Sequence, residues 1–158
     1  MATNVAFVGQ IRAVVSKGIA LRALGAAAAA TLGIDAYVHL DDAGFYDAVK
    51  TSTLSQGDLF RAEAALAIVL AAALLIWPQR LLVWAAAFAV AASAFGAVLL
   101  YRYVDVGSIG PLPNMYEPTW VSPGKLMSAY AEGAGVLLTA LGTSIVVTGH
   151  RRAHRARV

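Results

Sequence analysis

The sequence contains no cysteine and few charged residues. Without cysteine the chain has no disulfide, no thiolate metal ligand and no thiol redox centre. Charged residues make up 13% of the 158 residues, which is about half the share that a water-exposed surface carries. We therefore do not expect a soluble globular domain.

The sequence also lacks the motifs of common nucleotide-binding and hydrolytic enzymes. It has no G-x-x-x-x-G-K-[ST] phosphate loop, no G-x-G-x-x-G dinucleotide turn, no G-x-S-x-G nucleophile elbow and no H-E-x-x-H zinc motif. The basic residues behind the formal net charge of +3 lie at the ends of apolar segments and form no stripe interleaved with aromatic residues. We expect neither an enzyme nor a nucleic-acid-binding protein, and no cofactor.

Hydrophobic residues are abundant: they make up 59% of the chain, and the mean hydropathy is +0.69. A helix needs about 20 apolar residues to cross the hydrocarbon core of a bilayer. Four runs reach that length, at approximately residues 18–40, 59–77, 81–101 and 126–148. They lack the alternation of barrel strands, and spanning helices satisfy their own backbone hydrogen bonds. We predict an all-α integral membrane protein, one domain over residues 1–158, built as an antiparallel bundle of four transmembrane helices.

Local signals mark the ends of these helices. Ser55 followed by Asp58 is a capping-box variant that opens the second helix. Pro78 closes that helix, and the short connector over residues 77–80 predicts a hairpin between the second and third helices. Ser122 and Pro123 open the fourth helix, since proline is well tolerated at the first helical position.

The basic residues predict the orientation in the membrane. With four spans, one side receives Arg12, Lys17, Arg22, Arg80, Arg151, Arg152, Arg155 and Arg157. By the positive-inside rule this side is cytoplasmic, so both termini are cytoplasmic and the protein is a multi-pass component of a bacterial plasma membrane. A cleaved signal peptide is the alternative for the first run. We favour an uncleaved span because the apolar run continues through Ile34 to Leu40.

Segments outside the spans suggest contacts with lipid. Residues 1–17 have the pattern of a cytoplasmic amphipathic helix on the inner leaflet, with a frayed terminus as the alternative. The basic tail over residues 149–158 is suited to anionic headgroups. In the outer loop, the stretch DDAGFYDAV from Asp41 predicts either a short interfacial helix or an irregular loop.

Ionisable residues inside the spans are the candidate functional residues, because charge in hydrocarbon is costly and normally faces a partner or a cavity. Counting residues from the helix ends, at the rise of an α-helix, places acids of three helices in one layer, roughly 5 to 12 Å below the outer edge of the hydrocarbon. The residues of this layer are Asp35, His39, Arg61, Glu63, Arg102 and Glu132.

Two interpretations of this layer remain open. In the structural one, the carboxylates pair with the arginines, His39 or tyrosines and define helix register. In the functional one, they line an outward-facing pocket for a lipid headgroup, quinone, cation or small amphiphile. We do not expect a metal site, because neighbouring arginines oppose a divalent ion, and His39 alone cannot give bis-histidine haem ligation.

Two stretches carry a resemblance to a known group of proteins. Residues 39–64 contain an HL pair at the end of the first span and G-D-L-F at the start of the second, and residues 115–133 contain EPTW, SPGK and AE. In these motifs the chain resembles a group of small four-span membrane proteins of high-GC Gram-positive bacteria with no established activity. The resemblance covers about a third of the chain and implies the same four-span topology.

The leading functional expectation is a non-catalytic accessory or interaction component of a larger membrane assembly. Its partners would be membrane lipids and other membrane proteins or a second copy of itself. The alternative is an outward-facing ligand-binding or permease-like protein that uses the Asp, His, Glu and Arg layer.

Overall fold

The computed structural model describes residues 2–121 and 123–155, without the side chains of residues 2–15, 17, 123 and 152–154. Within these residues the chain forms helices α1 (Ala2–Ala43), α2 (Gln56–Ile76), α3 (Leu81–Tyr103) and α4 (Pro123–Arg155), plus a short 3-10 helix, η1 (Phe45–Ala48). The described part has no strand beyond two isolated bridges, Lys50 with Ser55 and Ile109 with Leu112. The prediction of an all-helical chain is thus confirmed.

Each of the four long helices has a segment long and apolar enough to cross a membrane. These segments are Gly18–Ala43, Gln56–Ile76, Leu81–Tyr103 and Gly124–Arg151. The predicted spans match them, with helix ends that extend up to a few residues further. Hydropathy marks the part of a helix that suits hydrocarbon, whereas backbone hydrogen bonding continues into the polar interface.

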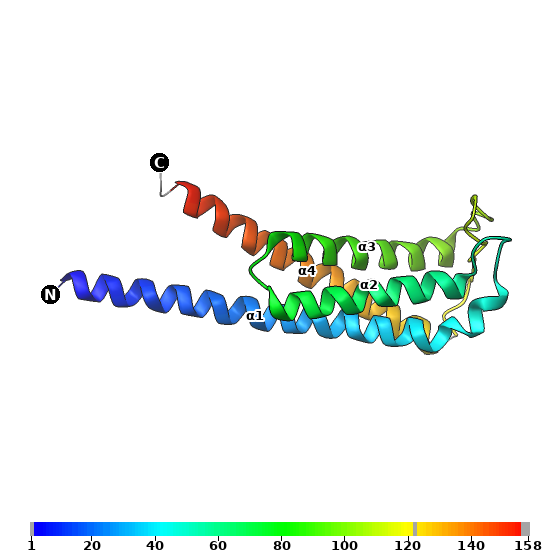
Figure 1. Cartoon of the computed structure of the whole chain (residues 1–158), viewed down its shortest axis with the longest axis horizontal. Coiled ribbons are helices and arrows are strands. Elements are labelled where there is room, and N and C mark those ends of the chain that lie inside the picture. The colour runs from blue at the N-terminus through cyan, green and yellow to red at the C-terminus, as the bar shows by residue number, and fades with distance from the viewer. Residues whose placement is uncertain (1, 122, 156–158) are drawn as a thin grey trace.

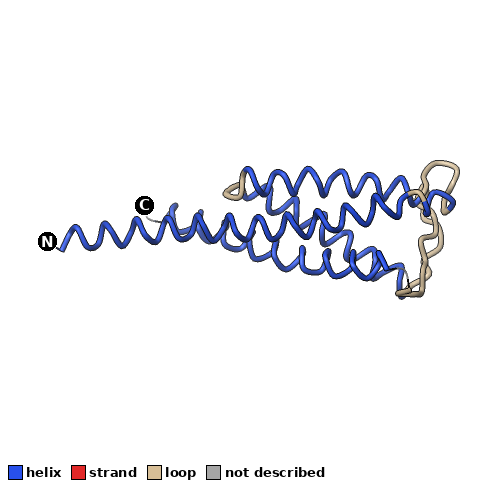
Figure 2. Tube along the Cα trace, turned by 90° about the horizontal axis from the view of Figure 1, so that it is seen from below, coloured by secondary structure: helices blue, strands red, loops and turns tan. Residues whose placement is uncertain are grey.

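The helices pack as an up-and-down bundle (Figures 1 and 2). α1 lies between α2 and α4, and α3 packs against the same two helices from the other side. The N-terminal end of α1 and the C-terminal end of α4 lie at one end of the bundle, and the two longer loops, between α1 and α2 and between α3 and α4, lie at the other (Figure 1). Consecutive long helices thus run in opposite directions in this view.

The N-terminal segment continues the first span without a break. α1 begins at Ala2, and its first half projects beyond the bundle as a straight extension (Figure 1). Residues 2–17 are therefore helical, whereas the amphipathic pattern assigned to them depends on side chains outside the described residues.

Small residues bring the helices close together, and larger apolar residues face outward. Ala28, Ala64, Ala67 and Ala87 are fully buried, and Trp84 is the largest fully buried side chain. The outer surface instead exposes large apolar side chains, among them Leu66, Val69, Leu82, Val121 and Leu137. Small residues at the interface and bulky apolar ones outside are typical of helices packed in lipid.

The predicted capping box is present at the start of α2. The backbone N–H of Asp58 donates to the Ser55 hydroxyl at 3.0 Å, and the backbone N–H of Ser55 donates to Asp58 Oδ2 at 3.0 Å. α2 ends at Ile76, two residues before Pro78, and α4 begins at Pro123 as predicted. Ser122, the other residue of the α4 signal, lies outside the described residues.

Ser55→Ala is expected to lower the free energy of unfolding by about 1 kcal/mol, since it removes the side-chain acceptor of the first turn of α2. Thermal unfolding of the purified protein in detergent measures the change. Thr53→Ala is the control, because the Thr53 side chain makes none of these capping contacts. Equal stability of the Ser55 variant and the wild type would contradict the capping role.

Candidate functional site

Asp35 and His39 form the first part of the site, one turn apart on α1. The two side chains share a face, and His39 Nδ1 lies 3.0 Å from Asp35 Oδ1 and 3.0 Å from the Asp35 backbone oxygen. Asp35 is only 2% exposed. The sequence spacing of these two residues therefore translates into direct contact inside the bundle.

α2 adds Glu63 to this pair. Glu63 Oε2 lies 3.2 Å from His39 Nδ1, so the imidazole nitrogen faces carboxylates from two helices. Phe60, one turn before Glu63, packs edge-on against the His39 ring with 4.7 Å between ring centres. This aromatic contact limits rotation of the imidazole and holds its nitrogen toward the acids.

α4 completes the group through Ser128 and Glu132. The Ser128 hydroxyl lies 2.7 Å from Asp35 Oδ1 and 2.9 Å from Glu132 Oε1. Glu132 is 3% exposed. Asp35, Glu63 and Glu132 thus converge as predicted, and we call Asp35, His39, Glu63, Ser128 and Glu132 the polar cluster.

Several oxygens of the polar cluster have no hydrogen-bond partner. Among the described residues, Oε1 of Glu63 and Oε2 of Glu132 are buried without one, and Oε2 of Glu63 has only the ion-pair contact of 3.2 Å with His39 Nδ1. His39 Nδ1 carries at most one proton, and the Ser128 hydroxyl donates to one carboxylate at a time. With all three carboxyl groups ionised, the cluster has more buried acceptors than the surrounding side chains supply with donors, and a bound proton or a further group would remove that cost.

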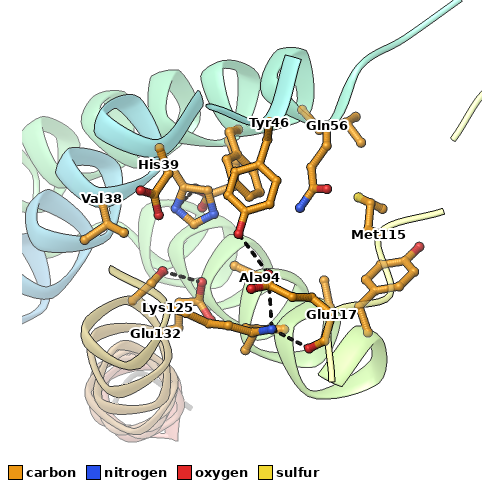
Figure 3. A pocket seen from close by; sticks show the side chains of 17 residues that line it. Val38, His39, Tyr46, Gln56, Ala94, Met115, Glu117, Lys125 and Glu132 are labelled. Atoms are coloured by element: carbon orange, nitrogen blue, oxygen red, sulfur yellow. Dashed lines mark hydrogen bonds and ion pairs between the residues drawn. The ribbon is translucent and has the colours of Figure 1, made fainter. Parts of the chain in front are cut away.

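A cavity of about 210 Å³ opens beside the cluster (Figure 3). Four residues of the polar cluster line it, and its other walls are largely apolar or aromatic. The lining residues outside the cluster are Val38, Asp42, Tyr46, Gln56, Leu59, Phe60, Ala94, Ala97, Val98, Tyr101, Met115, Glu117 and Lys125. Concave, mostly apolar pockets with a few convergent polar groups are the usual form of a small-ligand site.

Tyr46, Glu117 and Lys125 surround the loop end of this cavity, and we call them the mouth (Figure 3). The Tyr46 hydroxyl donates to Glu117 Oε2 at 2.9 Å, while Lys125 Nζ donates to the Glu117 backbone oxygen at 2.7 Å and lies 3.3 Å from its Oε2. Burial, and then the hydrogen bond to Glu117, raises the pKa of Tyr46 above its usual value. The phenol therefore stays protonated and remains the donor.

The mouth is formed by segments that the sequence left undecided. η1 supplies Tyr46, so the short helix expected in this loop is present as one 3-10 turn. Phe45 is exposed, as expected for an interfacial residue, whereas Tyr46 turns inward and packs against Phe60. Sequence reasoning did not select Tyr46, Glu117, Lys125 or Ser128 as site residues, although Glu117 and Lys125 lie within the EPTW and SPGK motifs.

Arg61 and Arg102 do not join the polar cluster, contrary to expectation. Arg61 makes two hydrogen bonds to Asp47, each of 2.8 Å, and lies 3.6 Å from Asp58. These hydrogen bonds hold the pKa of Asp47 below its usual range. The physical reason is helix geometry: residues two positions apart, such as Arg61 and Glu63, point to nearly opposite faces.

Arg102 is held by aromatic rings. Its guanidinium lies 5.0 Å from the centre of the Tyr103 ring and 5.5 Å from that of Trp120. Neither arginine is among the residues that line the cavity. Arg61 therefore lies against Asp47 and Asp58, and Arg102 against the two rings, in place of the polar cluster.

Comparisons with known proteins add no identification. No family model, no curated protein and no solved structure matches this chain. The fold defines a class all the same: a chain with four helices suited to spanning a membrane, as in multi-pass membrane proteins. The resemblance to the four-span group remains an expectation from the sequence.

Proposed function

We propose that this chain is a membrane protein of the bacterial plasma membrane that binds a small cation in a cavity open to the outer side. The observation that carries the proposal is the convergence of three carboxyl groups in the polar cluster, two of which, Glu63 and Glu132, line the cavity and carry buried oxygens without a hydrogen-bond partner. This geometry favours the ligand-binding alternative over a purely structural layer, because a structural layer needs satisfied partners.

The charge balance of the site supports a cationic ligand. The polar cluster holds three carboxyl groups and a single imidazole, so with all three ionised one protonated histidine leaves negative charge uncompensated. Lys125 is paired with Glu117 and Arg61 with Asp47. Arg102 lies against two aromatic rings, with its Nε buried and without a hydrogen-bond partner. A buried anionic group without a counter-charge is destabilising, and a bound cation would remove that cost.

The proposed direction of access follows from the basic residues. Arg80 in the α2–α3 connector and Arg151 near the end of α4 belong to the end of the bundle away from the mouth. The positive-inside rule makes that end cytoplasmic, with both termini, and directs the mouth outward. Tagging the C-terminus and testing its accessibility in intact cells examines this orientation.

The cation proposal is tested by ligand-induced stabilisation of the full chain in detergent. Thermal unfolding is followed with K⁺, Ca²⁺, Zn²⁺, Mn²⁺ and a small organic ammonium ion, each added to protein first treated with chelator. A ligand at 100 times its Kd stabilises the folded state by about 2.7 kcal/mol. We expect at least one of these cations to raise the Tm of the wild type.

The double variant Glu63→Gln/Glu132→Gln is expected to lose this rise. Asp41→Asn is the matched control, since it removes one negative charge at the same end of α1 from an exposed residue that does not line the cavity. It should keep the response. No stabilisation of the wild type by any cation, or an undiminished response in the double variant, would refute the proposal.

The accessory role expected from size and composition is a separate proposal. It predicts that the chain co-purifies from native membranes with a larger assembly in mild detergent. An isolated, monodisperse chain would count against it without affecting cation binding.

A further inference from the structure

We infer that the polar cluster is a binding site for one divalent first-row transition-metal ion, with Asp35, His39 and Glu63 as its ligands. This inference rests on the proposed function and names the class of cation. One ligand atom from each of the three residues lies within 4.8 Å of the other two. The residues come from two packed helices, and metal sites in helical bundles are commonly built from inward-facing side chains of neighbouring helices.

The spacing of the ligand atoms fits a small ion. A tetrahedral ion with bonds of 2.0–2.1 Å places neighbouring ligand atoms about 3.3 Å apart. His39 Nδ1 lies 3.0 Å from Asp35 Oδ1 and 3.2 Å from Glu63 Oε2. The Asp35 and Glu63 oxygens lie within 4.8 Å of one another, and His39 Nδ1 also lies 3.0 Å from the Asp35 backbone oxygen. Binding one ion would therefore require the imidazole to lose its Nδ1 proton and turn from that backbone oxygen.

A second observation, independent of this spacing, points to a ligand. Glu132 is 3% exposed, it lines the same cavity, and its Oε2 has no hydrogen-bond partner. In Figure 3 its side chain points from α4 toward the side on which His39 lies. A buried carboxylate oxygen next to the cluster supplies further negative charge and an acceptor for a water molecule on the ion.

Ser128 gives the site an orienting contact of the kind that metal centres use. Its hydroxyl lies between Asp35 Oδ1 and Glu132 Oε1, so the Asp35 oxygen that would bind the ion also contacts a side chain of the neighbouring helix α4. Such outer contacts orient ligands, and their loss typically costs about 10- to 100-fold in metal affinity.

The donor set selects among cations. One imidazole nitrogen with carboxylate oxygens suits Zn²⁺ and its first-row neighbours, whereas Ca²⁺ takes six to eight oxygens and Mg²⁺ keeps an octahedral, largely hydrated shell. The cavity beside the cluster leaves the ion reachable from the mouth. The same interatomic distances also suit a protonated His39 paired with two carboxylates, and the experiment must separate that ion pair from a metal centre.

The test is isothermal titration of the chelator-treated full chain in detergent with ZnCl₂, with CaCl₂ and MgCl₂ for comparison. We expect one Zn²⁺ per chain, bound at least about 10-fold more tightly than Ca²⁺ or Mg²⁺. X-ray absorption at the zinc edge should report nitrogen and oxygen ligands at about 2.0–2.2 Å.

His39→Gln is expected to weaken Zn²⁺ binding at least about 100-fold, because even outer-shell losses reach that size. His150→Gln is the matched control at an exposed histidine near the far end of α4, and it should bind as the wild type does. Glu63→Gln is the second variant in case the first does not fold, and it should show the same loss. Size-exclusion profiles show which variants are folded.

The outcomes separate this inference from the broader proposal. Absence of Zn²⁺ binding, or equal binding by folded His39→Gln and wild type, overturns the metal site. If Zn²⁺ does not bind but another cation stabilises the wild type through Glu63 and Glu132, the cation-binding function stands and the metal inference falls. If no cation binds, both fall.

Discussion

The double variant Glu63→Gln/Glu132→Gln is expected to be more stable than the wild type when no cation is present. Oε1 of Glu63 and Oε2 of Glu132 are buried without a hydrogen-bond partner, Oε2 of Glu63 contacts only His39, and Asp35 adds a third buried carboxylate. Neutral amides of the same shape remove the charge and add N–H donors for the neighbouring oxygens. Replacing buried charged groups by neutral ones is often stabilising by about 1–4 kcal/mol, and we expect a gain within that range.

The free energy of unfolding in chelator-containing buffer, measured by thermal or detergent denaturation, gives the sign of this effect. With the cation at 1,000 times its Kd the order should reverse, because only the wild type gains binding energy, about 4.1 kcal/mol. Asp41→Asn should remain close to the wild type in both buffers. If the acids served only to define helix register, the double variant would be less stable in both, and that result would contradict a binding role.

Such a reversal would mean that the fold accepts a cost in stability to keep a binding site. Sites of this kind are commonly less stable than the same fold with the site neutralised. In this chain the cost is concentrated in a few atoms of α2 and α4, while the alanine-rich contacts that hold the bundle together extend along the helices, with Ala36 and Ala64 directly beside the site.

The arrangement of the acids was predictable because it depends on regular geometry. Helix rise gives the depth of each residue from its helix end, and facing lipid is costly for a carboxylate, so three acids at one depth turn inward together. The contact between Asp35 and His39 follows from their spacing of four residues. The capping box at Ser55 was predictable for the same reason, since it depends only on residues close in sequence.

The partners of Arg61 and Arg102 were not predictable from depth, because depth does not give the helix face. Arg61 lies close to Glu63 in depth but on another face, where η1 presents Asp47. The position of η1 depends on how its loop folds over the bundle end. The mouth was not predictable for the same reason, since Tyr46 and Glu117 are 71 residues apart and meet only through loop packing.

Ser128 was missed for a different reason. Serine and threonine in apolar helices usually donate to a carbonyl of the preceding turn, as Thr139, Thr143 and Ser144 do in α4. Ser128 instead contacts Asp35 and Glu132. Only its position opposite Asp35 distinguishes it from the others, and that position is a property of the packed α1–α4 pair.

Gly142→Ala is expected to destabilise the bundle by about 1–3 kcal/mol, the usual range for overpacking a core. Gly142 is buried in α4, and a Cβ atom there would collide with Cε3 and Cζ3 of the Trp84 ring. The ring has little freedom to move away, because Trp84 is fully buried and its indole N–H donates to the Pro78 backbone oxygen at 2.6 Å. Thermal unfolding in detergent measures the loss.

Two further variants show whether the loss comes from this contact. Gly33→Ala is the control: no atom lies within 4 Å of a Cβ at this exposed glycine of α1, so better helix propensity should leave stability equal or raise it by up to about 1 kcal/mol. Trp84→Phe reduces the size of the ring, and its cost should be smaller in the Gly142→Ala background than in the wild type if the two residues collide. Equal costs in both backgrounds would show that the glycine is needed for another reason than the close packing of α3 on α4.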